Sequence, residues 1–301
     1  MKASVQGESN KISEKFFLAA TLALLAGTVH GQIFVANSQS STIGEYTTSG
    51  ATVNASLVSG LNGPTGLAVV GNDLFVANYS GTIGEYTTSG ALVNASLVSG
   101  LYQPVAIAVE GNNLFVLSHN GYVGEYTTSG ATVNSELVLG LNNPYGLAVS
   151  GNALFVASVG NNTIGEYTTS GATVNASLVS GLNSPAGLAV VGNVLYVANE
   201  SGTIGEYTTS GALINASLVS GLSGPIAVAV NGNDLYVANN VGGSIGEYTT
   251  SGATVNASLV SGLGRYNPWG LEVVPEPSTM ALIGIGMGAL YLIHRRLSFV
   301  S

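Results

Sequence analysis

The chain has 301 residues, of which 46% are hydrophobic and 7% are charged, with a formal net charge of −9. Between Gln32 and Val274, twelve Asp and Glu residues stand against one basic residue, Arg265. This acidic balance disfavours phosphate backbones, so we expect no nucleic-acid partner. The lack of cysteine excludes disulfides and thiolate chemistry. Because Gly, Tyr and β-branched residues dominate and long helical patterns are missing, the expected fold class is all-β.

The first 31 residues have the pattern of a secretory signal peptide. Lys2, Lys11 and Lys15 form a positive region, and the apolar core that follows, Phe16–Ala26, is too short to span a bilayer comfortably. Small residues precede Gln32, where we expect the cleavage. We therefore predict a signal helix over 1–31; the alternative is an uncleaved membrane anchor.

The C-terminus combines a polar motif, a short apolar run and two arginines. Pro275-Glu276-Pro277 comes first, followed by an apolar segment at 280–293 and then Arg295-Arg296. Fourteen residues make a helix of about 21 Å, less than the hydrocarbon core of about 30 Å, so snorkelling arginine arms must cover the difference. The arginines also favour an orientation with this end in the cytoplasm.

These three parts, in this order, resemble the PEP-CTERM sorting signal of Gram-negative bacteria. The resemblance covers about residues 274–296 and implies export, transient anchoring in the inner membrane and processing near Pro275–Pro277 by an exosortase-type enzyme. It also implies delivery to the cell surface or to an extracellular polysaccharide matrix. The alternative is an ordinary membrane tail. We assign residues 275–301 to this sorting tail.

Six copies of one unit fill the middle of the chain. The octapeptide GEYTTSGA begins at Gly44, Gly84, Gly124, Gly165, Gly205 and Gly246, at intervals of 40 or 41 residues. Each unit contains four β-like segments separated by turn residues; in the second unit these are GLAVV, LFVAN, TIGEYTT and ASLVSGL. This period and strand count are typical of one four-stranded antiparallel propeller blade.

The order of the segments at the two ends predicts a closed ring. The repeats open with Ile33–Asn37, a second strand without a first, and finish with Asn267–Val274, a first strand without a second. The last strand can therefore complete the first blade, which removes free sheet edges. We predict a six-bladed propeller over 32–274, closed by three strands from the beginning of the chain and one from its end.

The repeat also resembles NHL and streptogramin-lyase-type propellers, on its PxGLAV, GN-L-[FWY]-V and IGEY segments. The resemblance covers about residues 33–274. It implies a propeller fold, although those lyases have seven blades and this chain supplies six. Their activity relies on histidine and glutamate at the top of the channel, and here only His119 could take that role.

Other catalytic groups are scarce. Six glutamates recur in the repeat, but we expect them on the third strands, too far apart to share one ion, and assign them a structural role. They are Glu45, Glu85, Glu125, Glu166, Glu206 and Glu247. Among the inner strands, Glu272 is the lone carboxylate. We therefore expect no catalytic site, no metal and no cofactor.

One face of the propeller differs between the copies. The loops before the first strand and those between the second and third strands should emerge on the same face, and these loops vary while the other turns hardly change. Seven ring side chains gather there, and they form the candidate ligand site: Tyr79, Tyr102, His119, Tyr122, Tyr145, Tyr266 and Trp269. Exposed rings beside Asn, Ser and Gln suit the apolar faces and hydroxyls of sugars. The alternative is that several of them, Trp269 above all, plug the channel.

The sequence therefore favours an exported, non-catalytic propeller that binds exopolysaccharide or a surface glycan through the varied face. Two alternatives remain at this level. One is a lyase or hydrolase related to the streptogramin lyases, and the other is a structural spacer whose similar blades reflect duplication alone.

Overall fold

The structure is a computed structural model that describes residues 31–275. The expected signal helix, the apolar segment 280–293 and nearly all of the sorting tail lie outside the described residues. Within 31–275, no helix has the length and apolarity that a membrane crossing requires.

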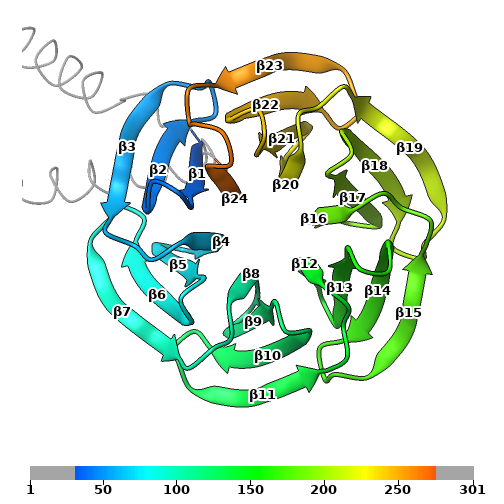
Figure 1. The fold of residues 1–301 in the computed structure, drawn as a ribbon, viewed down its shortest axis with the longest axis horizontal. Helices are drawn as coiled ribbons and strands as arrows, with labels where there is room; N and C mark the ends of the chain where they lie inside the picture. Colours follow the sequence, from blue (N-terminus) through cyan, green and yellow to red (C-terminus); the bar gives the residue numbers. More distant parts are fainter. Residues whose placement is uncertain (1–30, 276–301) are drawn as a thin grey trace, which may run out of the picture. The chain divides into compact units, whose positions relative to one another are not determined.

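Twenty-four strands form six four-stranded antiparallel sheets, arranged as a ring (Figure 1). From the channel outwards, blade 1 contains β24 (Pro268–Val274), β1 (Gln32–Asn37), β2 (Thr42–Thr47) and β3 (Thr52–Ser59). Blade 2 contains β4 (Pro64–Val70), β5 (Asp73–Asn78), β6 (Thr82–Thr87) and β7 (Leu92–Ser99). Blade 3 contains β8 (Pro104–Glu110), β9 (Asn113–Ser118), β10 (Tyr122–Thr127) and β11 (Thr132–Val138).

The other three blades repeat this order. Blade 4 contains β12 (Pro144–Ser150), β13 (Ala153–Ser158), β14 (Thr163–Thr168) and β15 (Thr173–Val179). Blade 5 contains β16 (Pro185–Val191), β17 (Val194–Asn199), β18 (Thr203–Thr208) and β19 (Leu213–Ser220). Blade 6 contains β20 (Pro225–Asn231), β21 (Asp234–Asn239), β22 (Ser244–Thr249) and β23 (Thr254–Val260).

The predicted closure is confirmed. Strand β24 pairs antiparallel with β1, so that Val273 lies opposite Ile33 and Leu271 opposite Val35. Blade 1 therefore takes three strands from the beginning of the ring and one from its end. This pairing covers the inner edge of β1 and the outer edge of β24, which would otherwise both be open to another chain.

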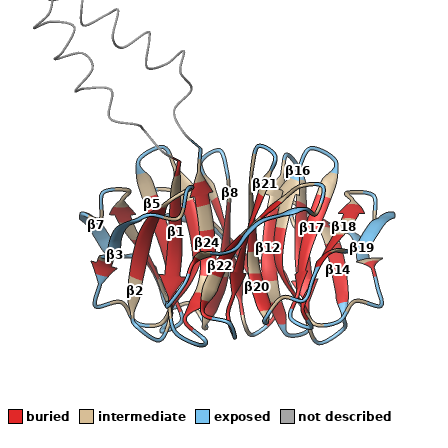
Figure 2. Cartoon of the chain, turned by 90° about the horizontal axis from the view of Figure 1, so that it is seen from above, coloured by how far each residue is buried: buried red, intermediate tan, exposed pale blue. Residues whose placement is uncertain are grey.

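The hydrophobic core is divided into layers between neighbouring blades. The second strands supply its centre, since side chains such as Phe34, Leu74 and Phe115 are at most 1% exposed. The layer that joins the ends of the ring packs Ile33 and Leu271 of blade 1 against blade 6. Burial falls outwards, and the fourth strands are largely exposed (Figure 2). The fold is therefore stabilised by blade-to-blade packing, which only a closed ring completes.

A glycine in each TTSG turn allows the blades to approach closely. Gly130 has φ +87°, and a Cβ there would lie 2.5 Å from the backbone oxygen of Leu97 in the neighbouring fourth strand. The other five glycines of this turn have the same conformation and face the equivalent leucine, including Gly50, which faces Leu259 across the closure. The six copies keep this turn nearly identical because both the left-handed backbone and the close contact exclude a side chain.

Candidate functional site

The two sets of varied loops are joined on one face of the ring. In every blade, the residue that follows the second strand donates its backbone N–H to a carbonyl of the loop before the first strand. Examples are Tyr79 to Gly63 at 2.8 Å and His119 to Gln103 at 3.1 Å. We call this surface the variable face. The opposite surface, with the GN and TTSG turns, is the repeat face, and the paired ends Gln32 and Val274 lie there.

The variable face presents two sets of equivalent positions. The inner positions directly follow the proline that begins each first strand, and they hold Trp269, Thr65, Val105, Tyr145, Ala186 and Ile226 in blades 1 to 6. The outer positions directly follow the second strand, and they hold Ser38, Tyr79, His119, Val159, Glu200 and Asn240. Each set contains six different residues on an almost repeated backbone. The side chains of this face therefore do not follow the six-fold repeat of the fold.

Four of the seven predicted aromatic residues form one continuous series. The ring centroids of Tyr79 and His119 are 6.4 Å apart, those of His119 and Tyr145 are 5.6 Å apart with perpendicular planes, and those of Tyr145 and Trp269 are 6.2 Å apart. We call these residues the aromatic series. Such separations lie within the range of favourable aromatic pairs. Rings from blades 2, 3, 4 and 1 thus form one connected row.

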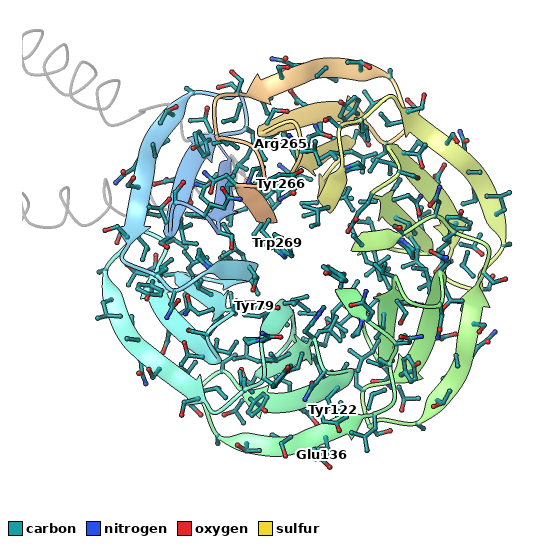
Figure 3. All side chains as sticks on the ribbon, viewed as in Figure 1. Tyr79, Tyr122, Glu136, Arg265, Tyr266 and Trp269 are labelled. Carbon is teal, nitrogen blue, oxygen red and sulfur yellow. The ribbon has the colours of Figure 1, made fainter. Side chains whose placement is uncertain are left out.

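The last pair of the series spans the channel mouth. Tyr145 and Trp269 belong to blades 4 and 1, which lie on opposite sides of the ring, and Figure 3 shows Trp269 directed towards the centre. Both rings are half-buried and border a cavity of about 120 Å³ that the inner strands line. Trp269 also packs against the hydrophobic layer between blades 6 and 1. These two side chains therefore narrow the mouth as well as offering ring surface to a ligand.

The other three predicted residues do not join the series. Tyr102, Tyr122 and Tyr266 are 57%, 36% and 43% exposed, and within the described propeller no ring-to-ring contact connects them to the other four. The Arg265 guanidinium lies 4.6 Å from the centroid of the Tyr266 ring, as a cation–π pair. These side chains add exposed ring surface at separate points of the variable face.

Buried acceptor atoms lie just beneath the outer positions. Asn78 ends its second strand opposite Pro64, and its Nδ2 donates to the Thr82 hydroxyl at 3.3 Å. Its Oδ1 is buried without a partner in the described residues, and the same holds for Oδ1 of Asn37, Asn199 and Asn239 and for Nδ1 of His119. The proline opposite Asn78 has no N–H that could donate a hydrogen bond to this acceptor. These acceptors leave unused hydrogen-bonding capacity below the face.

Glu200 is a site residue that the sequence reasoning did not single out. It occupies the same outer position as Tyr79 and His119, and its side chain is exposed. Desolvation raises the pKa of Tyr145, and the charge of Glu200 and the nearby Tyr79 hydroxyl raise that pKa further. Glu200 thus shares the variable face with the aromatic series, in the blade next to that of Tyr145. Comparing the six copies position by position, rather than collecting ring residues only, would have identified it.

Glu272 projects into the channel between two cavities. It lines both the cavity below the mouth and a second one of about 260 Å³ towards the repeat face. At the same position the other five blades carry Ala68, Ala108, Ala148, Ala189 and Ala229. The prediction that Glu272 is the lone carboxylate of the inner strands was wrong, because Glu110 ends the inner strand β8, exposed on the repeat face. Burial among apolar inner strands raises the pKa of Glu272 to about 8.

The six repeated glutamates lie on the third strands, at equivalent places in separate blades. Their partners differ: Glu45 accepts a hydrogen bond from Gln32 Nε2 at 2.7 Å, and Glu247 accepts one from the Tyr236 hydroxyl at 3.5 Å. Among residues 31–275, no three acidic or histidine side chains gather in a way that could hold a metal ion.

Comparison with known proteins gives the sorting signal and the fold. Residues 273–296 match the PEP-CTERM protein-sorting motif, and this range contains Pro275, Glu276, Pro277, Arg295 and Arg296. The chain therefore carries a sorting signal for export to the cell surface by an exosortase-type system, as predicted. No curated protein sequence matches the chain.

Solved structures with the same fold include proteins of several kinds. A chain of the nidogen/laminin complex superimposes with a TM-score of 0.72 at 15% identity, covering 82% of this chain and 99% of its own. A streptogramin B lyase gives 0.62 at 18% identity, covering 82% of this chain and 87% of its own. A gluconolactonase from Xanthomonas campestris gives 0.58 at 16% identity, covering 71% and 86%. At such identities the likeness shows the propeller fold, and it confirms the predicted resemblance to streptogramin-lyase propellers at that level. It does not distinguish a binding function from a catalytic one.

Proposed function

We propose that this exported propeller is a non-catalytic binding module that recognises a glycan, such as the exopolysaccharide of the producing cell, through its variable face. The observation that carries the proposal is the aromatic series, in which rings from four blades form one connected row that ends at the channel mouth. Aromatic faces bind the apolar faces of sugars, and the Asn and Ser side chains of the surrounding loops can bond to sugar hydroxyls. Pockets with few polar groups among rings are typical of ligand sites.

The chemistry of the site favours binding over catalysis. His119 is the only histidine of residues 31–275, and the carboxylate that lines the channel cavities, Glu272, lies on an inner strand, whereas Glu200 lies at an outer position of the variable face. A general acid–base mechanism needs positioned groups within hydrogen-bonding reach of the reacting atoms. Among the described residues, His119 has no hydrogen-bonded partner at Nδ1 that could orient it as a base.

Binding of purified residues 32–274 to the producer's exopolysaccharide tests this function, since this segment contains all 24 strands. Tyr79→Ala and Trp269→Ala should each weaken binding about fivefold, because one aromatic contact contributes about 1 kcal/mol. Tyr102→Ala is the control: it removes a ring of the variable face that is more exposed than Tyr79 but lies outside the aromatic series, and it should change affinity little. Isothermal titration gives the affinities, and mass spectrometry of the recovered glycan should find it unchanged.

Two outcomes would contradict the proposal. Absence of binding to any polysaccharide would exclude glycan recognition and would favour the alternative of a structural spacer. Cleavage of the glycan that disappears in His119→Ala would instead favour the lyase or hydrolase that some proteins of this fold represent.

We further propose that the segment 280–293 anchors the precursor in the inner membrane of a Gram-negative cell until processing near Pro275–Pro277 releases the propeller. The motif match at residues 273–296 supports this route. In cell fractionation, the full chain should pass from the inner membrane to the surface or matrix. A chain ending at Pro275 should never be found in the membrane fraction after signal cleavage; membrane retention of that shorter chain would contradict the anchoring role.

A further inference from the structure

The charge of the variable face is distributed unevenly around the aromatic series. Among the twelve inner and outer positions, Glu200 carries the only ionisable carboxylate, and no position carries Lys or Arg. Arg265 lies in the longer loop before β24 and stacks on Tyr266. A ligand at the channel mouth therefore meets one negative charge and no positive charge from these positions.

Glu200 and the aromatic series share the variable face. Glu200 holds the outer position of blade 5, which packs against blade 4, the blade that carries Tyr145. The charge of Glu200 raises the pKa of Tyr145, in agreement with this placement. Desolvation raises the pKa of Glu200 itself, and a cation bound there would offset that cost.

The ring geometry suits a cation as well as an apolar sugar face. His119 and Tyr145 meet at an interplanar angle of 88°, and Tyr145 and Trp269 at 30°, so the faces surround a corner instead of forming a flat platform. A cation within about 6 Å of several ring centroids is attracted by each of them, most strongly by Trp. Aromatic rings together with a carboxylate are a recurring arrangement for ammonium groups.

The net charge of the whole propeller also favours a cationic ligand. Its twelve acidic residues against a single arginine create a negative field that repels polymers of uronic acids or phosphates. The same field draws cationic ligands towards the surface, but by itself it would not direct them to one face.

We infer that, if the proposed glycan binding holds, the aromatic series and Glu200 select sugars with a free, protonated amino group over N-acetylated or acidic sugars. The ligand class is thus a hexosamine polymer with at least some unacetylated residues. The ammonium group would lie between the Glu200 carboxylate and the rings of Tyr145 and Trp269, and the pyranose faces would contact Tyr79.

The test compares two oligosaccharides that differ only at the nitrogen: a β-1,4-linked hexamer of glucosamine and the hexamer of N-acetylglucosamine. Titration of the purified propeller, at a pH where the amine is protonated, should give at least tenfold higher affinity for the first. Glu200→Gln should abolish this preference and leave the affinity for the acetylated hexamer unchanged. Glu110→Gln is the matched control, since it removes an exposed carboxylate from the repeat face and should keep the preference.

Each outcome separates this inference from the function on which it rests. Equal affinity for both hexamers would overturn the amino-sugar preference and leave glycan binding intact. If Glu110→Gln weakened binding as much as Glu200→Gln, the overall acidic field and not this site would attract the amine, and the inference would fall. Binding of neither hexamer, nor of any polysaccharide, would overturn both proposals.

Discussion

A propeller that begins at Gln32 and ends at Gly264, without β24, is expected to lose its cooperative fold. The deletion removes the buried Leu271 and Val273, the half-buried Trp269 and the pairing partner of β1. At about 1.5–3 kcal/mol for each buried side chain, the loss is about 5 kcal/mol or more, comparable with the whole stability of many domains. Circular dichroism during heating measures the loss.

A propeller that begins at Gln32 and ends at Pro275 is the matched control, since it retains every described strand. The shorter protein should also associate, because the free edge of β1 can pair with another chain; size-exclusion chromatography with light scattering detects this. An equal midpoint of unfolding and a monomeric mass for both proteins would show that the closure contributes little.

Replacing Glu272 with Ala, the residue of the other five blades, should stabilise the propeller at alkaline pH. The folded-state pKa of Glu272 is about 8, whereas the ordinary value is 4.5. Between these values the unfolded chain has released the proton while the folded chain keeps it, so the free energy of unfolding falls as pH rises, by up to about 1.4 kcal/mol per unit. Above pH 8, Glu272 is ionised in the folded chain as well, and the buried charge destabilises the fold by its full amount.

Denaturant titrations at pH 5 and pH 8.5 measure this effect. Because Glu272 is partly accessible from the channel, we expect a gain of about 2–3 kcal/mol for Glu272→Ala at the higher pH and less than about 1 kcal/mol at the lower. Glu272→Gln should behave similarly, which separates charge from side-chain volume. Glu110→Gln, on the repeat face, should alter stability little at either pH. A gain of the same size at both pH values would assign the effect to packing.

The ring could be predicted because its evidence is local and repeated. Turn residues and apolar alternation define four strands in each unit, and the unpaired segments around Phe34 and Trp269 show how the ends must meet. The varied loops likewise identified one face, since chain direction alternates from strand to strand and places both loop sets on that side. These inferences need only the order of the segments.

The repeat pattern was thus enough to predict the blade, the number of blades, the closure and the face on which the copies differ. Which side chains meet on that face depends on how the six blades pack. Tyr145 and Trp269 are paired because the inner strands of opposite blades leave a narrow channel, and Glu200 influences Tyr145 because their blades are neighbours. Such contacts depend on the diameter and packing of the ring, a property of all six interfaces together that no single repeat encodes.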